Sequence, residues 1–164
     1  MPYRLGTEIA QSVRETISFP DQIQGVGMEL TVKSILAFCD RGTIGFDNKD
    51  RVLPRTQELF WDKYNNDRLL FPGLYLANLN ELVSIPKDKI GFAIPRPSLL
   101  RMGVTLGTAV WDPGYVGHGQ VLLEVHNSFG LAIKKNARIL QLVFADLESE
   151  AVQLYNGIYQ EGKG

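Results

Sequence analysis

Short segments rich in β-branched and aromatic residues recur along the chain, separated by turns that contain glycine or proline. The segments are GMELTVKSILAF, GLYLANL, ELVSI, IGFAI, QVLLEV, LAIKK and RILQLVFADL. Such residues favour strands, and many short strands joined by these turns are typical of a β-sandwich or β-barrel. We therefore predict an all-β fold, in which the polar segment 40–68 is a hairpin with a long exposed connection.

Apolar residues at helical spacing occur near the N-terminus, in the stretch MPYRLGTEIAQSVRETI. Thr7 could cap a helix in which Ile9, Val13 and Ile17 share one face, and Pro20 would end it. The expected fold is therefore all-β with a short N-terminal helix.

Size and composition limit the organisation of the chain and its partners. Its 164 residues fit one domain, 1–164, and 45% hydrophobic with 21% charged residues is ordinary for a globular protein. A net charge of −1 gives no overall attraction to nucleic acid or to a membrane, so neither is an expected partner. Cys39 is the only cysteine, which excludes an intrachain disulfide and a cysteine-based metal site. Without an apolar signal core or a long apolar run, the predicted location is cytoplasmic.

The turn IPRPSLLRMGV contains candidate phosphate ligands. Arg96, Ser98 and Arg101 combine planar guanidinium groups with a hydroxyl, and these match phosphoryl oxygens in charge and geometry. Pro97 suits the first position of a short helix, because the N–H that proline lacks would be unpaired there in any case. The alternative is that both arginines are surface charges while the apolar residues of the turn fill the core.

Asp112 lies in the segment TAVWDPGYVGHG, directly before Pro113 and Gly114. An aspartate at this place is commonly a turn former whose side chain bonds to its own backbone. Here it is flanked by Trp111 and Tyr115, so it could instead orient a water molecule while a ring packs against a sugar. The residues alone leave both interpretations open.

Glu124 lies inside the apolar run VLLEVHN. Strand alternation places it on one face with Leu122 and His126, where it either faces solvent or occupies a polar pocket with a raised pKa. At the other end of the chain, the glycine-rich segment 155–164 could close over a ligand with Tyr159, Gln160 and Lys163. Such a tail is expected to be flexible when no ligand is bound.

Templates for metal-based or nucleophilic catalysis are missing from the sequence. His118 and His126 are the only histidines, no zinc-deaminase motif is present, and no GxSxG turn occurs. We therefore expect no metal held by the protein, and chemistry that uses carboxylates and water. Magnesium would arrive with a triphosphate substrate, bound mainly through phosphate oxygens and water.

Several motifs together resemble the trimeric dUTPase and dCTP deaminase superfamily. QGVGMEL, FPGLYLANLNELVSIP, RPSLLRMGV, DPGYVG, VLLEVHN, RILQLVF and YNGIYQ follow in the order seen in that superfamily, most closely in its archaeal-type dUTPases. The resemblance covers most of the chain beyond about Asp21. It implies a distorted, jelly-roll-like β-barrel of the β-clip type and a homotrimer whose active sites lie between subunits. It also implies deoxyuridine or deoxycytidine triphosphate as the substrate.

The resemblance also implies roles for individual residues. Arg96 and Ser98 would contact phosphate with help from Gln141, and Asp112 would orient the attacking water or contact the deoxyribose. Tyr115 would lie under the sugar and exclude a 2′-hydroxyl. The pyrimidine edge would be read by the main chain of Ala109, Val110 and Trp111, and the tail residues would cover the nucleotide: Tyr159, Gln160 and Lys163.

The two branches of the superfamily differ in reaction. In the dUTPase branch, a water activated by the aspartate attacks the α-phosphate of dUTP and pyrophosphate is released. In the deaminase branch a strand glutamate activates water for attack at C4 of the base, beside a serine and an arginine. Glu124 and Arg101 match that glutamate and arginine.

Three departures bear on the choice between the branches. Pro97 stands where the deaminase pattern RSSLAR has its first serine, and the WDPGYVGHG segment is longer than the usual deaminase segment. Glu29 replaces the usual aspartate of the first motif, which leaves the role of that motif open in both branches. We therefore predict a dUTP diphosphatase, with dCTP deaminase as the alternative and a non-catalytic nucleotide-binding barrel as the third possibility.

Overall fold

The computed structural model describes residues 2–160 and confirms the predicted all-β fold. Its strands are β1 (Val13–Arg14), β2 (Met28–Phe38), β3 (Thr56–Glu58), β4 (Asp67–Leu70), β5 (Gly73–Ser84), β6 (Lys89–Pro95), β7 (Val104–Gly107), β8 (Val110–Trp111), β9 (Val116–Val125), β10 (Leu131–Lys134) and β11 (Arg138–Asp146). Its helices are α1 (Gly6–Ile9), α2 (Phe19–Gln22) and α3 (Pro97–Arg101), with the short 3₁₀ turns η1 (Ala10–Ser12) and η2 (Asn48–Asp50).

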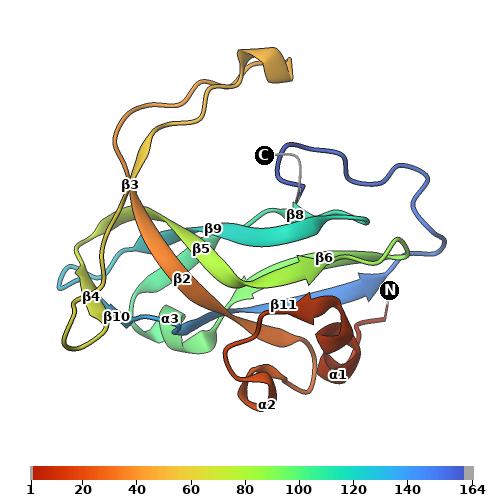
Figure 1. The fold of residues 1–164 in the computed structure, drawn as a ribbon, viewed down its shortest axis with the longest axis horizontal. Coiled ribbons are helices and arrows are strands. Elements are labelled where there is room, and N and C mark those ends of the chain that lie inside the picture. The colour runs from red at the N-terminus through yellow and green to blue at the C-terminus, as the bar shows by residue number, and fades with distance from the viewer. Residues whose placement is uncertain (1, 161–164) are drawn as a thin grey trace.

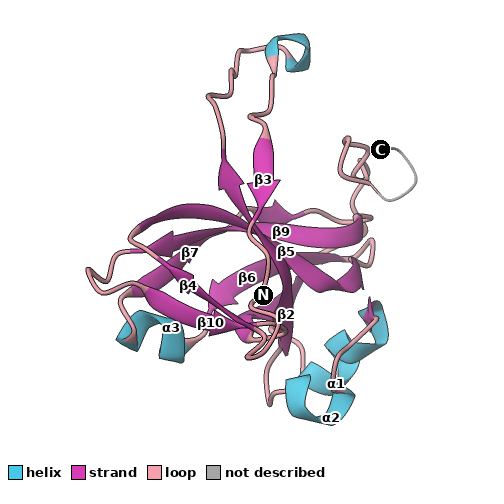
Figure 2. Ribbon diagram, turned by 60° about the vertical axis from the view of Figure 1, so that its left-hand side comes forward, coloured by secondary structure: helices cyan, strands magenta, loops and turns pink. Residues whose placement is uncertain are grey.

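Most strands belong to one antiparallel sheet that curls around the core (Figures 1 and 2). Its order is β7-β9-β5-β2-β11-β6-β8, with β1 paired to β5 and β3 to β2, while β4 and β10 form a separate pair. Alternate residues of β9 are buried, as expected of a strand with one face on the core. Each segment predicted as a strand is found, and GLYLANL and ELVSI form the single strand β5.

A short N-terminal helix is present, as predicted, but the expectation that it continues to Pro20 was wrong. The helix α1 ends at Ile9, its first turn receives no side-chain cap from Thr7, and the chain then turns through η1 into β1. Val13 leaves the helical path because it pairs with Val83 of β5, where a β-branched residue suits the sheet. Pro20 opens α2 instead of ending a helix, since the first helical turn does not need its N–H.

Residues 39–55 form an arm that rises from the sheet between β2 and β3 (Figure 2). Paired hydrogen bonds of 2.9 Å join Thr43 and Val52 across the arm, and the turn η2 lies at its tip. The side chains of Ile44 and Phe46 are almost fully exposed. The structure thus confirms the predicted hairpin with an exposed connection.

Glu81 is a completely buried carboxylate that the sequence pattern did not reveal. It accepts hydrogen bonds from the Thr31 hydroxyl at 2.6 Å, the Thr31 N–H at 2.9 Å and the Gln22 amide at 2.8 Å. A charge can be buried at tolerable cost only with such partners. The network fixes α2 against β2 and β5.

An ion cluster fastens the N-terminal segment to the end of β11. Arg4 donates to Asp146 at 2.7 and 2.5 Å, and Lys89 lies 3.2 Å from Asp146 and 2.8 Å from Asp88. Hydrogen bonding from Arg4, followed by that from Lys89, lowers the pKa of Asp146. The Lys89 ammonium likewise lowers the pKa of Asp88. Within residues 2–160, none of the helices has the length and apolar character needed to cross a bilayer.

Candidate active site

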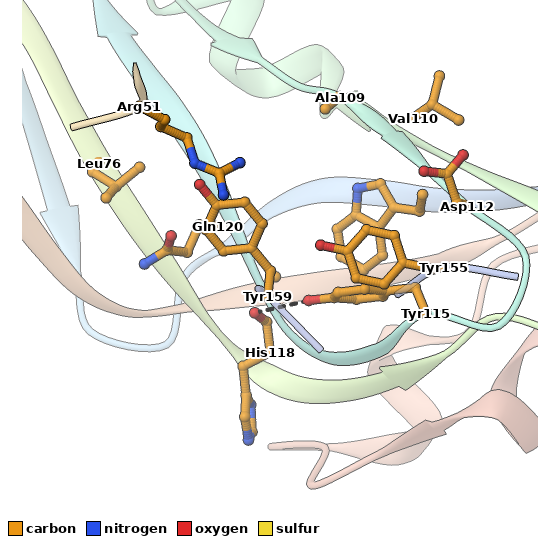
Figure 3. A pocket seen from close by; sticks show the side chains of 12 residues that line it. Arg51, Leu76, Ala109, Val110, Asp112, Tyr115, His118, Gln120, Tyr155 and Tyr159 are labelled. Carbon is orange, nitrogen blue, oxygen red and sulfur yellow. Dashed lines mark hydrogen bonds between the residues drawn. The ribbon is translucent and has the colours of Figure 1, made fainter. Parts of the chain in front are cut away.

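A cavity of about 490 Å³, called here the Asp112 pocket, opens beside β8 and the first half of β9 (Figure 3). Small-molecule sites typically measure roughly 300–1,000 Å³. Its lining residues come from the arm, the sheet and the C-terminal segment: Arg51, Leu76, Ala109, Val110, Trp111, Asp112, Tyr115, His118, Gly119, Gln120, Tyr155 and Tyr159. The structure therefore brings together six of the residues predicted from sequence: Ala109, Val110, Trp111, Asp112, Tyr115 and Tyr159.

Trp111 is buried and held against the sheet by glycines on two neighbouring strands. It pairs with Gly91 of β6, where a Cβ would lie only 3.1 Å from the Cβ of Trp111. A Cβ at Gly119 of β9 would lie 2.4 Å from the indole ring, a distance that no side chain tolerates. These two glycines leave room for the Trp111 side chain against the sheet, and so help to position the residue that follows it, Asp112.

Asp112 presents an exposed carboxylate to the pocket. Its backbone carbonyl accepts a hydrogen bond from the Tyr115 N–H at 3.1 Å, and Gly114 supplies the positive φ of +82° that the turn needs. Within the described part of the chain, the Asp112 carboxylate makes no hydrogen bond or ion pair. The Asp112 side chain therefore does not hydrogen-bond to its own backbone, as the turn-former interpretation required. Its carboxylate is free to bind water or a ligand.

Aromatic rings form one wall of the pocket. The ring of Tyr115 packs edge-to-face with Trp111 at 5.7 Å and with Tyr155 at 5.3 Å between centroids. Its hydroxyl donates to the carbonyl of His118 at 3.2 Å. Contacts on two sides together with the hydrogen bond fix the orientation of the Tyr115 ring.

The C-terminal segment folds back onto the Asp112 turn. The Gln160 side chain accepts from the Val116 N–H at 3.1 Å and donates to the Gly114 carbonyl at 3.2 Å. The Tyr155 N–H donates to the Pro113 carbonyl at 2.9 Å. Tyr159 is thereby held at the pocket, whereas Gln160 anchors the segment and does not line the cavity. The predicted ligand Lys163 lies outside the described residues.

Arg96 lies away from the pocket and is bound to Glu29. Its Nε lies 2.5 Å from Glu29 Oε1, and its Nη1 donates to the Arg138 carbonyl at 3.2 Å. Arg138 Nη1 lies 3.0 Å from Glu29 Oε2, a charge contact whose direction is too poor for a hydrogen bond. Gln141 faces Glu29 across β11 and β2, and its amide donates to the Val26 carbonyl. Glu29, whose role the sequence left open, is thus the centre of a buried ion cluster.

The helix α3 begins at Pro97, as predicted, and carries the other phosphate candidates. Ser98 and Arg101 are exposed, and Arg101 only donates to the Pro97 carbonyl at 3.2 Å. The alternative that the apolar residues of this turn fill the core holds for Leu99, which is buried. It does not hold for Leu100 and Met102, which are exposed.

Strand register separates this helix from the Asp112 pocket within one chain. Trp111 pairs with Gly91 near the start of β6, whereas Arg96 follows the last residue of that strand. At about 3.4 Å per residue, the separation along β6 is roughly 17 Å. In Figure 1, α3 and β8 accordingly lie apart.

Glu124 lies further along β9, outside the pocket lining. It shares a strand face with Gln120, a lining residue, and is half-buried between Leu74 of β5 and Thr105 of β7. His126 Nε2 lies 3.4 Å from its Oε2. This face of β9 therefore carries both polar and apolar side chains, as the alternation of the sequence indicated.

Besides Tyr155 of the predicted tail, five lining residues were not predicted as site residues: Arg51, Leu76, Gly119, His118 and Gln120. The last two stand at alternate positions after the Asp112 turn, a spacing that could have identified them as facing the pocket. Arg51 comes from the arm, about sixty positions earlier than Asp112, and nothing in its neighbourhood in the sequence signals the contact.

The Asp112 pocket offers one unpaired carboxylate to a metal ion and no complete set of ligands among the described residues. Among residues 2–160, no group of three or more His, Cys, Asp or Glu side chains is arranged to hold a metal ion. An ion that takes most of its ligands from phosphate oxygens and water needs no such group, and the free carboxylate of Asp112 is compatible with one nearby.

Fold and pocket define the class: an all-β protein whose curled sheet carries a small-molecule pocket with aromatic walls and an unpaired carboxylate. The chain belongs to the dCTP deaminase-like family, because the model of that family matches residues 4–147. This finding confirms the resemblance seen in the sequence motifs.

Two relatives and one solved structure are similar to this chain. The probable deoxyuridine 5′-triphosphate nucleotidohydrolase of Methanosarcina acetivorans is 42% identical over 149 residues, covering 90% of this chain and 86% of the relative. The deoxyuridine 5′-triphosphate nucleotidohydrolase of Methanocaldococcus jannaschii is 40% identical over 140 residues, covering 85% of this chain and 88% of that protein. The 2′-deoxycytidine 5′-triphosphate deaminase structure from Agrobacterium tumefaciens has a TM-score of 0.63 at 18% identity. That match covers 87% of this chain but only 47% of the deaminase chain, and shows a common fold.

Proposed function

We propose that this protein is a dUTP diphosphatase, which hydrolyses dUTP to dUMP and pyrophosphate. The observation that carries the proposal is the unpaired carboxylate of Asp112 in a pocket of suitable size, beside the fixed ring of Tyr115. Archaeal relatives of about 40% identity over most of their length carry the corresponding name, which supports the same substrate here.

In the proposed reaction Asp112 acts as the general base. It accepts a proton from a water molecule whose oxygen forms a bond to the α-phosphorus, while the bond from that phosphorus to the pyrophosphate oxygen breaks. The backbone of Ala109, Val110 and Trp111 would read the uracil, and Tyr115 would pack against the deoxyribose. Magnesium, when bound through the triphosphate, neutralises charge on the phosphoryl oxygens.

The working enzyme is proposed to be a homotrimer with each site between two chains. Support comes from the separation of roughly 17 Å between the Asp112 pocket and Arg96 along β6, because both groups are implied in binding one nucleotide. A second hollow adjoins the pocket and is lined by largely apolar residues of β6, β8 and β11, among them Ile94 and Val110, each about half exposed. A neighbouring chain seated on this apolar face would lie directly beside the pocket.

Replacing Ile94 with lysine tests this assembly, because a charge on the apolar face should prevent association. Ile17→Lys is the matched control, since Ile94 and Ile17 are 51% and 49% exposed and Ile17 lies near α2. Light scattering after size-exclusion chromatography should find monomers for Ile94→Lys and trimers for the control. Trimers in both variants would remove this face from the interface.

Deamination of dCTP is the second candidate, favoured by the name of the family model and by the position of Glu124 on the same strand face as Gln120. Against it, Pro97 offers no hydroxyl where the deaminase pattern has serine. In a deaminase, Glu124→Gln should abolish ammonia release. In a diphosphatase, the same change should alter turnover only modestly.

Incubating the pure protein with magnesium and either dUTP or dCTP tests the proposal directly. Pyrophosphate release from dUTP without ammonia release from dCTP is the expected result. Ammonia release alone would favour the deaminase. Binding of either nucleotide without any turnover would favour a non-catalytic nucleotide-binding protein.

A further inference from the structure

Arg51 directly follows the turn η2 at the tip of the arm and places a guanidinium at the Asp112 pocket. The residue lines the cavity, and in Figure 3 its guanidinium points toward the ring of Tyr159, next to Gln120. It is half-buried, and among the described residues its side chain has no hydrogen bond or ion pair. A cation left without a partner inside a pocket is suited to an anionic ligand.

The other cations of the arm are either paired with a carboxylate or absent from the pocket lining. Arg55 lies 2.6 Å from Asp40, and Lys49 lies 3.0 Å from Asp47. Arg41 is exposed and does not line the cavity. Arg51 is therefore the arm residue whose charge remains available at this site.

Backbone hydrogen bonds of the arm fix the position of the Arg51 main chain. Its N–H donates to the Asn48 carbonyl at 3.1 Å, and the next residue, Val52, is paired to Thr43 by two hydrogen bonds of 2.9 Å. Gly45 permits close packing of the two sides, because a Cβ there would lie 2.7 Å from the Cβ of Asp50. The side chain thus starts from a defined turn and not from a loose loop.

Charge balance indicates which part of a nucleotide Arg51 meets. Apart from His118, the charged side chains that line the pocket are Arg51 and Asp112, and Asp112 is assigned to the attacking water. A triphosphate carries several negative charges, and a guanidinium fork matches its oxygens better than it matches a neutral base or sugar.

We propose that Arg51 is a phosphate-binding residue, supplied by the arm, that contacts the triphosphate of the bound nucleotide. This inference rests on the proposed function and adds a ligand to it. Because the contact is made to phosphate, Arg51 should strengthen binding of the triphosphate substrate relative to a nucleoside without phosphates.

Calorimetric titration of the full-length protein with the α,β-imido analogue of dUTP and with deoxyuridine tests the proposal. Arg51→Gln should weaken binding of the analogue roughly 10- to 100-fold, as expected for one lost charge-assisted contact, and leave deoxyuridine affinity unchanged. Arg51→Lys should recover part of the loss. Arg41→Gln, which removes the same charge from the same arm, should bind both ligands as the wild type does.

Two results would overturn the proposal. One is equal binding of the analogue by Arg51→Gln and Arg41→Gln, and the other is an equal loss for the analogue and deoxyuridine, which would move the contact to the base or sugar. Thermal unfolding of each variant shows whether a loss of binding comes from misfolding. If Arg51→Gln is misfolded, the test rests on the affinity of Arg51→Lys for the analogue. A wild-type protein that hydrolyses dUTP while Arg51→Gln keeps its KM refutes the role of Arg51 alone. A wild type that neither binds the analogue nor hydrolyses dUTP refutes the proposed function as well.

Discussion

Asp112 and Arg96 directly follow the paired strands β8 and β6, yet their charges have different surroundings. The Asp112 carboxylate is exposed in a pocket and has no partner within the described residues. The Arg96 guanidinium is held by Glu29, whose side chain is only 7% exposed, and by the Arg138 carbonyl. The Asp112 carboxylate is therefore available to a ligand, whereas the charge of Arg96 is already balanced by Glu29.

The difference divides the predicted phosphate contacts into two kinds. The ion pair with Glu29 uses part of the hydrogen-bonding capacity of Arg96, so a large part of its contribution is to link the end of β6 to β2 across β11. Ser98 and Arg101 on α3 are exposed and have no side-chain partner among the described residues. If the proposed assembly brings α3 of one chain to the Asp112 pocket of the next, these two residues would join Arg51 in contacting the phosphates.

Asp112→Asn should cause the largest loss of activity, because it removes the proposed base while keeping the shape of the side chain. We expect kcat to fall by about 10²- to 10⁴-fold, the usual contribution of a positioned base. Affinity for the α,β-imido analogue should be nearly unchanged. Pyrophosphate release measured at saturating dUTP gives kcat, and a kcat equal to that of the wild type would remove Asp112 from the mechanism.

Mixing two inactive variants should show whether the two regions come from different chains. Ser98→Asp places a carboxylate where a phosphate is expected, without disturbing any contact, since Ser98 is exposed. Alone it should lower dUTP hydrolysis by tenfold or more through like-charge repulsion. Trimers refolded from equal amounts of Ser98→Asp and Asp112→Asn chains should recover about a quarter of wild-type activity, because that share of two-chain sites is intact.

The same mixture would give no recovery if each site belonged to a single chain. A double variant carrying both changes, refolded with an inactive single variant, is the control, because such mixtures contain no intact two-chain site. Activity in that control would show that refolding itself produces the signal.

The strands could be predicted from the sequence because their causes are local. Runs such as QVLLEV and RILQLVFADL carry β-favouring residues at strand spacing, and glycine or proline marks their ends. The extent of the N-terminal helix was predicted wrongly because its cause is not local. Val13 has a helical neighbourhood, but its pairing with Val83, seventy residues away, outweighs the local preference.

The candidate site was predicted where its residues are close in sequence. Residues 109–115 stay together because they form one short turn and its flanks. Arg51 was missed because it lies on the arm, about sixty positions before Asp112, and meets the pocket only in the folded chain. The partners of Glu29 were missed because Arg96 and Arg138 lie far away in the chain and meet it only through the order β2-β11-β6.

Arg96→Leu should reduce stability more than it reduces the chemistry. Removing Arg96 leaves the nearly buried carboxylate of Glu29 with Arg138 alone, so we expect a loss of about 1–3 kcal/mol in the free energy of unfolding. Urea unfolding monitored by tryptophan fluorescence measures it. Arg101→Leu, which removes an exposed arginine that contacts only a backbone carbonyl, should stay within about 0.5 kcal/mol of the wild type.

Removing both charges tests the cause of this loss. In the double variant Glu29→Leu with Arg96→Leu no buried carboxylate is left unpaired, so part of the stability should return. A single variant as stable as the wild type would show that Arg96 is not structurally engaged with Glu29, and would restore it as a free phosphate ligand.

Asp146→Asn should have the smallest effect, and one that depends on pH. The folded-state pKa of Asp146 is held below its usual value of 3.8 by Arg4 and Lys89. Its stabilising effect is therefore complete above that value and is lost as the pH falls through the lower folded pKa. The melting temperature of Asp146→Asn should lie below that of the wild type at pH 7, and the difference should shrink as the pH falls below 3.8. Glu148→Gln, an exposed carboxylate with no ion pair among the described residues, should follow the wild type throughout. A gap for Asp146→Asn that stays constant with pH would mean that the loss comes from packing and not from the charge.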